Sequence, residues 1–125
     1  QLQRRGWIVE HDIVKSSGGN VDHVVAGLQG IFTIEVKLTR SGKSEIAQAR
    51  SHAVWAANAL GAPVVPVLCV ANRALKPRLS SGVWIVGAAG LARFLRRHRA
   101  GSVDVAEAQR QLLRLRGRRP DGRLR

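Results

Sequence analysis

The sequence has little of several residue types, and each scarcity excludes a class of protein. Its single cysteine, Cys69, has no second cysteine to pair with, which excludes the disulfide framework of small secreted domains. Its apolar residues come in short blocks, far from the ~18 uninterrupted apolar residues that a membrane-spanning helix needs. No charged and then apolar leader opens the sequence. These absences predict a cytoplasmic protein that does not enter a membrane.

Acidic residues are scarce as well, and this scarcity indicates a partner. The chain has 8 Asp and Glu against 21 Lys and Arg, which gives a formal net charge of +13. Such an excess attracts polyanions, so nucleic acid is the expected partner. Two alternatives stay open. One is an arginine-rich coding bias, and the second is binding to a membrane surface, although no basic helix carries the broad apolar face that such binding uses.

The order of the expected elements is typical of an α/β domain. Strand-like runs cover residues 7–15, 20–26, 31–38, 62–71 and 82–87. The first three are joined by the short glycine-bearing links SSGG and GLQG, which predicts an antiparallel meander. Apolar and small residues then recur with a helical period over 43–60, and Gly61 ends that helix. Because a helix between two core strands usually makes them parallel, we expect a mixed sheet of about five strands flanked by helices.

Two arginine-bearing helices are expected in the second half of the chain, at 88–98 and 103–117. Each carries a ridge of arginines suited to phosphate, unless these ridges are only solvated helix faces. The ridges consist of Arg93, Arg96 and Arg97 on the first helix, and of Arg110, Arg114 and Arg118 on the second. We expect residues 1–100 to form the core domain, with its first helix cut short at QLQRRG, and residues 101–125 to form a basic helix and a frayed tail.

Two acids and a lysine interrupt the most strand-like segment, and the turn geometry brings them together. If GLQG closes the second hairpin between Ala26 and Ile31, Asp22 lies directly across from Glu35. Lys37 then shares their face, because side chains alternate along a strand. Two half-buried carboxylates at this distance repel each other, so a divalent cation is expected between them. Mg²⁺ or Mn²⁺ suits such oxygen ligands better than zinc.

The first hairpin decides which other acids reach this site. If SSGG forms its four-residue loop, Asp22 faces Ile13, and Glu10 and Asp12 turn to the opposite face of the sheet. These two acids are then not ligands, although a slip of one residue in the register would reverse the assignment.

The histidines give no zinc site in this register. Adjacent residues of a strand point opposite ways, so His23 is expected on the far face of the sheet. His11 and His52 are candidates for the edge of the site.

The stretch GNVDHVVAGLQGIFTIEVK resembles the signature of the nuclease-related domain family, NERD, a branch of the PD-(D/E)xK nuclease superfamily. The likeness covers about residues 6–95 and includes a preceding Gly-Trp, Asn-x-Asp-His, a glycine turn, Ile-Glu-x-Lys, and a glutamine early in the next helix. It implies a restriction-endonuclease-like core in which Asp22, Glu35 and the carbonyl of Val36 hold the metal. Lys37 then orients or activates the attacking water, and Gln48 makes a supporting contact.

The resemblance leads to two functional predictions. The first is a Mg²⁺- or Mn²⁺-dependent nuclease acting on DNA, and the second is a non-catalytic nucleic-acid-binding module on the same fold. Phosphodiester hydrolysis uses a metal that activates water, and a lysine can share in stabilising charge on the phosphate. Many relatives add a glutamate from the helix before the first strand, and QLQRRG contains no acid, so either the missing part of that helix supplies the glutamate or the site is incomplete.

Overall fold

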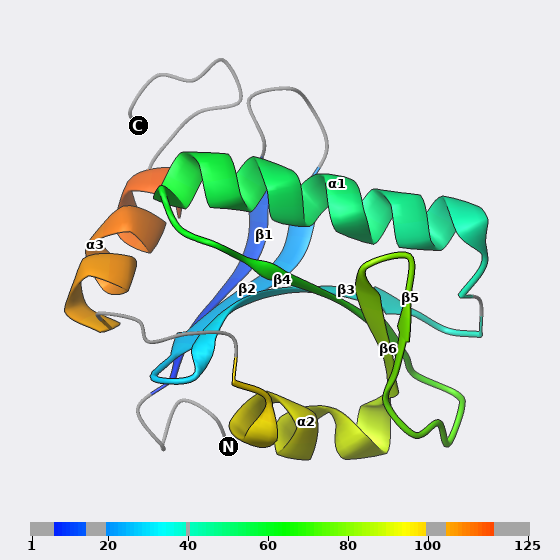
Figure 1. Ribbon diagram of the computed structural model, residues 1–125. Helices are drawn as coiled ribbons and strands as arrows, with labels where there is room; N and C mark the ends of the chain where they lie inside the picture. The colour runs from blue at the N-terminus through cyan, green and yellow to red at the C-terminus, as the bar shows by residue number, and fades with distance from the viewer. Residues whose placement is uncertain (1–6, 15–19, 40, 100–104, 117–125) are drawn as a thin grey trace.

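The fold is a six-stranded sheet between two layers of helices, described by a computed structural model for residues 7–14, 20–39, 41–99 and 105–116. The strands are β1 (Ile8–Val14), β2 (Asn20–Gly27), β3 (Gly30–Lys37), β4 (Val65–Val70), β5 (Arg78–Ser80) and β6 (Val83–Gly87). The helices are α1 (Lys43–Leu60), α2 (Leu91–Arg97) and α3 (Val105–Arg116), and a 3-10 turn at Ala88–Gly90 leads into α2. Helices α1 and α3 cover one face of the sheet and α2 covers the other (Figure 1).

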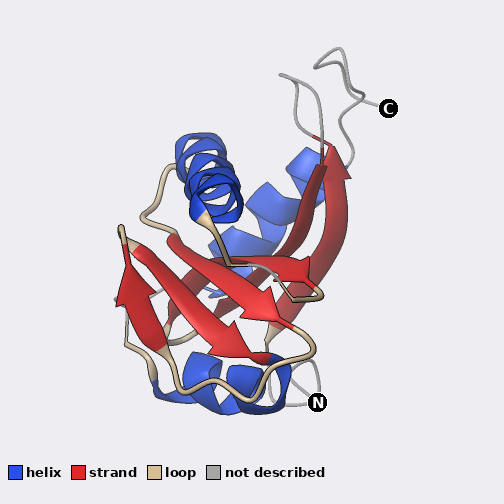
Figure 2. Cartoon of the chain, turned by 90° about the vertical axis from the view of Figure 1, so that its right-hand side faces the viewer, coloured by secondary structure: helices blue, strands red, loops and turns tan. Residues whose placement is uncertain are grey.

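The predicted mixed α/β architecture is confirmed. β1, β2 and β3 form the antiparallel meander, and α1 connects β3 to β4, which run parallel to each other. The spatial order is β1-β2-β3-β4-β6-β5, with β4 and β6 also parallel. Figure 2 shows the sheet with helices on both of its sides. The expected helix end at residues 1–6 and the tail at 117–125, which includes Arg118, lie outside the described residues.

One strand was not predicted. The three-residue edge strand β5 pairs antiparallel with β6 through a tight turn at Ser81 and Gly82. Both turn residues have positive φ, 49° and 80°, as a two-residue hairpin turn of the primed type requires. Three residues are too few for side-chain alternation to mark a strand in the sequence.

The α1 helix lies close to the sheet because small side chains form its inner face. Ala49, Ala53 and Ala56 lie on this inner face and are buried. The helix begins where the Glu45 carboxylate accepts the Gly42 N–H at 3.0 Å, a contact that satisfies one of the free donors of a helix start. It ends at Gly61, which has the left-handed φ of 65° typical of a helix C-cap.

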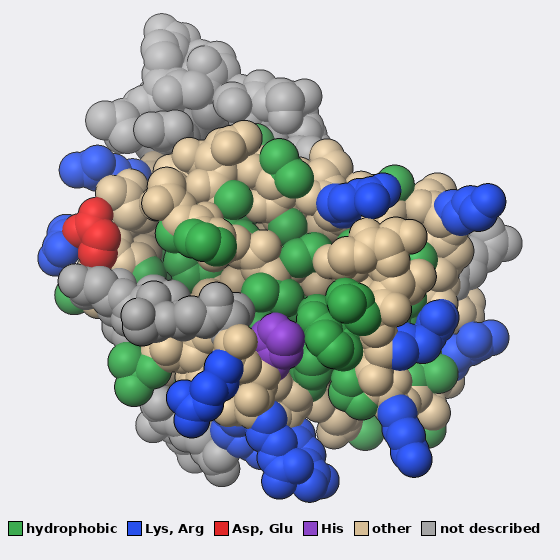
Figure 3. All heavy atoms as spheres, in the orientation of Figure 1, with side chains coloured by type: hydrophobic (Ala, Val, Ile, Leu, Met, Phe, Trp, Pro, Cys, Tyr) green, Lys and Arg blue, Asp and Glu red, His purple; other side chains and the backbone are tan. Residues whose placement is uncertain are grey.

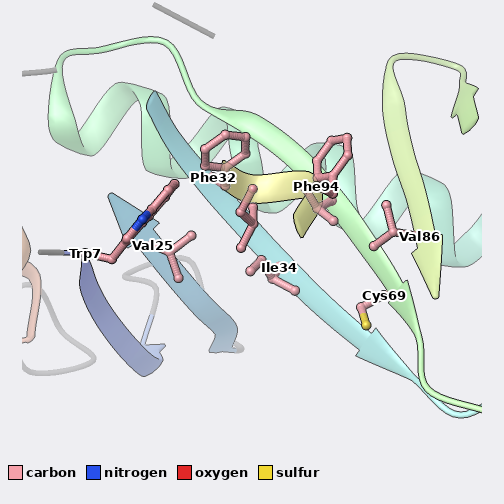
Figure 4. Close-up of a cluster of buried hydrophobic side chains, with 9 residues drawn as sticks. Trp7, Val25, Phe32, Ile34, Cys69, Val86 and Phe94 are labelled. Carbon is pink, nitrogen blue, oxygen red and sulfur yellow. The ribbon is translucent and has the colours of Figure 1, made fainter. Parts of the chain in front are cut away.

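A single apolar cluster, here called the α2-side core, fills the space between the sheet and α2 (Figure 4). It consists of Trp7, Val25, Phe32, Ile34, Val67, Cys69, Val86, Phe94 and Leu95. Trp7 packs so closely over Gly27 that a Cβ at this glycine would lie 2.6 Å from the indole ring. Any larger residue at position 27 would therefore displace Trp7.

The predicted register of the first hairpin is wrong by one residue. Ile13 pairs with Val21 and His11 pairs with His23, so Asp22 does not face Ile13. Val14 pairs with Asn20, which leaves the five residues 15–19 between the paired ends instead of four. This register buries Ile13 and Val21 together, and burial of apolar pairs is what selects a register.

Two expectations change with this register. Position 12 moves to the place across from Asp22, so Asp12 and Glu10 are no longer excluded as neighbours of the site. His11 and His23 were expected on opposite faces, but they face each other across the strands with their Nδ1 atoms 2.5 Å apart.

Candidate active site

Asp22 and Glu35 are neighbours at the point where β2 separates from β3. The register predicted for this hairpin is confirmed by the pairs His23 with Ile34 and Ala26 with Ile31. Beyond His23 the regular backbone ladder ends, and the two strands are joined by hydrogen bonds between backbone N–H groups and side-chain carboxylates. The Asp22 Oδ2 accepts the Val36 N–H at 3.1 Å, and the Asp22 N–H points to Glu35 Oε1 at 3.5 Å.

Val36 turns both of its backbone polar groups toward Asp22. In an extended strand, the N–H and C=O of one residue point to the same edge. The Val36 N–H reaches Asp22, whereas the Lys37 carbonyl points the other way and accepts the Ala71 N–H at 2.8 Å. The Val36 carbonyl therefore faces the Asp22 side of β3, as the resemblance implies for a backbone ligand.

Glu35 is a buried carboxylate with a histidine partner. Its side chain faces α1 and the residue is 1% exposed, and Oε1 contacts Nδ1 of His52, which is 4% exposed. Burial raises the pKa of the Glu35 carboxyl above its ordinary value. The contact with His52 opposes this rise, and the negative charge of Asp22 adds to it. The site therefore holds a carboxylate in surroundings that disfavour its charge.

His52 contacts a candidate metal ligand directly, which the sequence did not predict. It was a candidate only for the site edge, yet it is the direct partner of Glu35. A signal for this existed, because His52 lies on the same face of α1 as the buried Ala49, Ala53 and Ala56. A histidine on the inner face of a helix needs a polar partner, and the facing strand carries one buried acid.

Lys37 and Gln48 occupy less enclosed positions. Lys37 is half-buried at the end of β3, two residues beyond Glu35, and strand alternation puts it on the face that α1 covers. Gln48 is exposed on α1, one turn before His52. The structure thus brings Asp22, Glu35 and the Val36 backbone into contact, and leaves Gln48 at the rim.

The donor set fits a hard divalent cation. Two carboxylates and a backbone carbonyl are oxygen ligands of the kind that Mg²⁺ and Mn²⁺ prefer, and a cation would relieve the repulsion between Asp22 and Glu35. The described residues contain no group of three or more His, Cys, Asp or Glu side chains that could hold a metal. Water and substrate phosphate would have to complete the coordination, as is usual for Mg²⁺.

The two predicted arginine ridges lie on opposite faces of the sheet. Arg93, Arg96 and Arg97 are exposed on α2, whereas Arg110 and Arg114 are exposed on α3. Lys and Arg side chains gather at the lower edge of the molecule in Figure 3, where Figure 1 shows α2. Arg110 already has an acidic partner within α3, because its Nε donates a hydrogen bond to Glu107 Oε2 at 2.9 Å.

Residues 1–72, more than half of the chain, match the family described as NERD, nuclease-related domain. The chain belongs to the nuclease-related domain family. This family is part of the PD-(D/E)xK-like nuclease superfamily, whose members generally use divalent metals. The matched segment contains all of the candidate site residues from Asp22 to His52, while α2 and α3 lie beyond it.

Searches of curated proteins and of solved structures found no significant match. None of the helices in the described ranges is long and apolar enough to span a membrane.

Proposed function

We propose that this domain is a metal-dependent nuclease that hydrolyses phosphodiester bonds in DNA. The observation that carries the proposal is the contact between Asp22 and a buried Glu35 at the end of the β2–β3 ladder, in a nuclease-related domain. A buried carboxylate beside a second carboxylate costs stability, and such costs concentrate at functional sites.

The roles of the residues follow from their positions. Asp22, Glu35 and the Val36 carbonyl would hold Mg²⁺ or Mn²⁺, which when bound would supply charge neutralisation and activation of water. His52 holds the buried Glu35 carboxylate in one orientation. Lys37 carries a positive charge to the same face, where it orients the attacking water and stabilises charge that develops on the phosphate. In the reaction, the water oxygen forms a new bond to phosphorus while one ester P–O bond breaks, the water loses one proton, and the leaving oxygen takes up one proton from solvent.

Other residues have supporting parts in this proposal. Gln48 contacts substrate or water at the rim, and the two arginine ridges bind DNA phosphates through charge-assisted hydrogen bonds. The ridges are Arg93, Arg96 and Arg97 on α2 and Arg110 and Arg114 on α3. Residues 1–100 form the nuclease core and residues 101–125 a basic extension, although α3 also packs the buried Ala108 and Leu112 against the sheet.

The alternative is a nucleic-acid-binding module on the same fold that does not cleave. Two observations favour it. His52 already occupies one oxygen of Glu35, and the described residues contain no group of three or more His, Cys, Asp or Glu side chains that could hold a metal.

A cleavage assay separates the two functions. Supercoiled plasmid and single-stranded DNA are incubated with the domain in Mg²⁺, in Mn²⁺ and in EDTA, with Glu35→Gln as the control for contaminating nucleases. We expect cleavage only with metal, and a loss of at least about 10²-fold in Glu35→Gln, the scale for losing a preorganised electrostatic contact. Binding without cleavage under all metal conditions would favour the alternative.

A further inference from the structure

An aromatic pocket opens on the α2 face of the molecule, on the opposite side of the sheet from Glu35. Its volume is about 460 Å³, within the range of small-molecule sites. Its walls are Trp84, Phe94, His98 and Pro77, and Arg93 and Arg97 stand beside them. No acidic side chain of the described chain lines it.

Three flat rings form one wall of this pocket. The His98 imidazole stacks on the Phe94 ring with an angle of 20° between planes and a centroid distance of 5.1 Å. The Trp84 indole lies 5.3 Å from both rings. Phe32, which is fully buried, supports them from behind at 6.4 Å from Phe94. The wall is therefore fixed by the α2-side core (Figure 4).

These rings do more than fill the core. The chain has only three Trp, two Phe and no Tyr, yet Trp84 and Phe94 both line this opening. Trp84 and His98 are only half-buried and leave ring surface open to the pocket. Arg93 and Arg97 are four residues apart on the exposed side of α2, so their guanidinium groups lie on the same side of the helix.

We infer that this pocket holds one unstacked base of a single-stranded nucleic acid, with the adjoining phosphate against Arg93 and Arg97. Aromatic side chains bind unstacked bases of any sequence, because every base has a π-face, and nearby arginines bind the backbone phosphate. A duplex presents its bases stacked and paired, so it cannot offer this contact.

The pocket is separate from the proposed catalytic site. Trp84 pairs with Val67, which pairs with Ile34, and these residues face α2. Glu35, the next residue after Ile34, points to α1. The inference shares with the proposed function the nucleic-acid partner and the phosphate contacts of Arg93 and Arg97, but it uses neither the metal nor cleavage. Its test is therefore made in EDTA, where metal-dependent cleavage does not occur.

The test compares two strands that differ only in their bases. Binding of oligothymidylate and of an abasic strand of equal length is measured by fluorescence anisotropy. We expect the parent protein to prefer oligothymidylate by about 5- to 150-fold, which corresponds to the ~1–3 kcal/mol of one stacked base. Trp84→Leu should lose most of this preference, while the matched change Trp55→Leu, in a half-buried tryptophan on the α1 face, should keep it.

A second variant keeps the test decisive if Trp84→Leu fails to fold. Arg93→Gln combined with Arg97→Gln changes only exposed side chains, and should weaken binding of both strands equally. It should also lower the slope of log Kd against log salt by roughly 1.4, for two lost phosphate contacts on a single strand.

Three results would overturn the inference. They are equal affinity of the parent for the two strands, an unchanged salt slope in the arginine double variant, and binding of thymidine monophosphate as tight as that of the strand. The last result would assign the pocket to a free nucleotide.

Discussion

The two faces of the sheet are packed with different kinds of side chain. On the α2 face, the core is entirely apolar and holds Trp7, Phe32 and Phe94. On the α1 face, apolar residues from α1 and the sheet surround three buried polar side chains. These three, Thr33, Glu35 and His52, are the buried polar side chains among the described residues.

The buried polar groups make the α1 face contribute less to the free energy of unfolding than an entirely apolar face would. The Thr33 hydroxyl is buried with no hydrogen-bond partner among the described residues, and Glu35 carries a charge that burial disfavours. Each such group costs free energy that a packed apolar side chain would not. Of these three groups, Glu35 and its partner His52 are the two that the proposed site uses.

The largest effect is expected on the α2 face. Phe32→Ala should reduce the free energy of unfolding by about 3–5 kcal/mol, because it removes a fully buried ring and leaves a cavity. Leu38→Ala, at a site 69% exposed, should change it by less than about 0.5 kcal/mol. Urea unfolding followed by circular dichroism measures both. Equal losses in the two variants would mean that the α2-side core is not packed as described.

On the α1 face, one substitution should lower the free energy of unfolding and a second should restore it. His52→Leu should reduce the free energy of unfolding by about 3–5 kcal/mol, because it leaves a buried charge without its partner. The double change His52→Leu with Glu35→Leu should be near neutral or stabilising, since an apolar pair carries no desolvation cost. A double variant as unstable as His52→Leu alone would contradict the pairing of the two residues.

The pH dependence of the His52→Leu effect has a definite sign. The folded-state pKa of Glu35 lies above its ordinary value, so the folded state binds this proton more tightly than the unfolded state. The free energy of unfolding therefore falls as pH rises through that pKa. The contact with His52 lowers the pKa of Glu35, so in His52→Leu this pKa should be higher and the fall in the free energy of unfolding with pH should be larger. Urea titrations of parent and variant across the acid-to-neutral range check this, and a deficit that shrinks with rising pH would contradict it.

A smaller effect is expected from metal. At a Mn²⁺ concentration 100 times its Kd, the parent should gain about 2.7 kcal/mol in the free energy of unfolding. Glu35→Gln should gain much less, because an amide is a poor ligand for a hard cation. Glu107→Gln, an exposed acid on α3, is the control and should behave as the parent does. If Mn²⁺ stabilises Glu35→Gln as much as the parent, the cation binds elsewhere.

The parts that the sequence predicted are those set by local rules. The second hairpin was predicted correctly because GLQG fixes the turn, and the turn fixes the partner of every residue of the ladder as far as His23. The first hairpin was not, since its loop contains five residues between Val14 and Asn20 and SSGG did not indicate that length. Its register depends on burying Ile13 with Val21, which is a property of the packed sheet.

The sequence indicated that His52 lies on the inner face of α1, but not that Glu35 is its partner, for a similar reason. The two residues are 17 positions apart and meet only when α1 packs on β3. Helical periodicity gives the inner face of α1, but the height at which a helix lies on a sheet is set by side-chain volumes on both. The small residues Ala49, Ala53 and Ala56 allow the close approach.

The most direct test of the catalytic site compares Lys37→Ala with Glu35→Gln. Mn²⁺ binding is measured by calorimetry and DNA cleavage by gel for both variants and the parent. Lys37→Ala should bind Mn²⁺ as the parent does but cleave about 10²–10³-fold more slowly, because only charge stabilisation is lost. Glu35→Gln should lose both metal affinity and cleavage, because a ligand is lost. Cleavage by Lys37→Ala at the parental rate would contradict the assignment of this site.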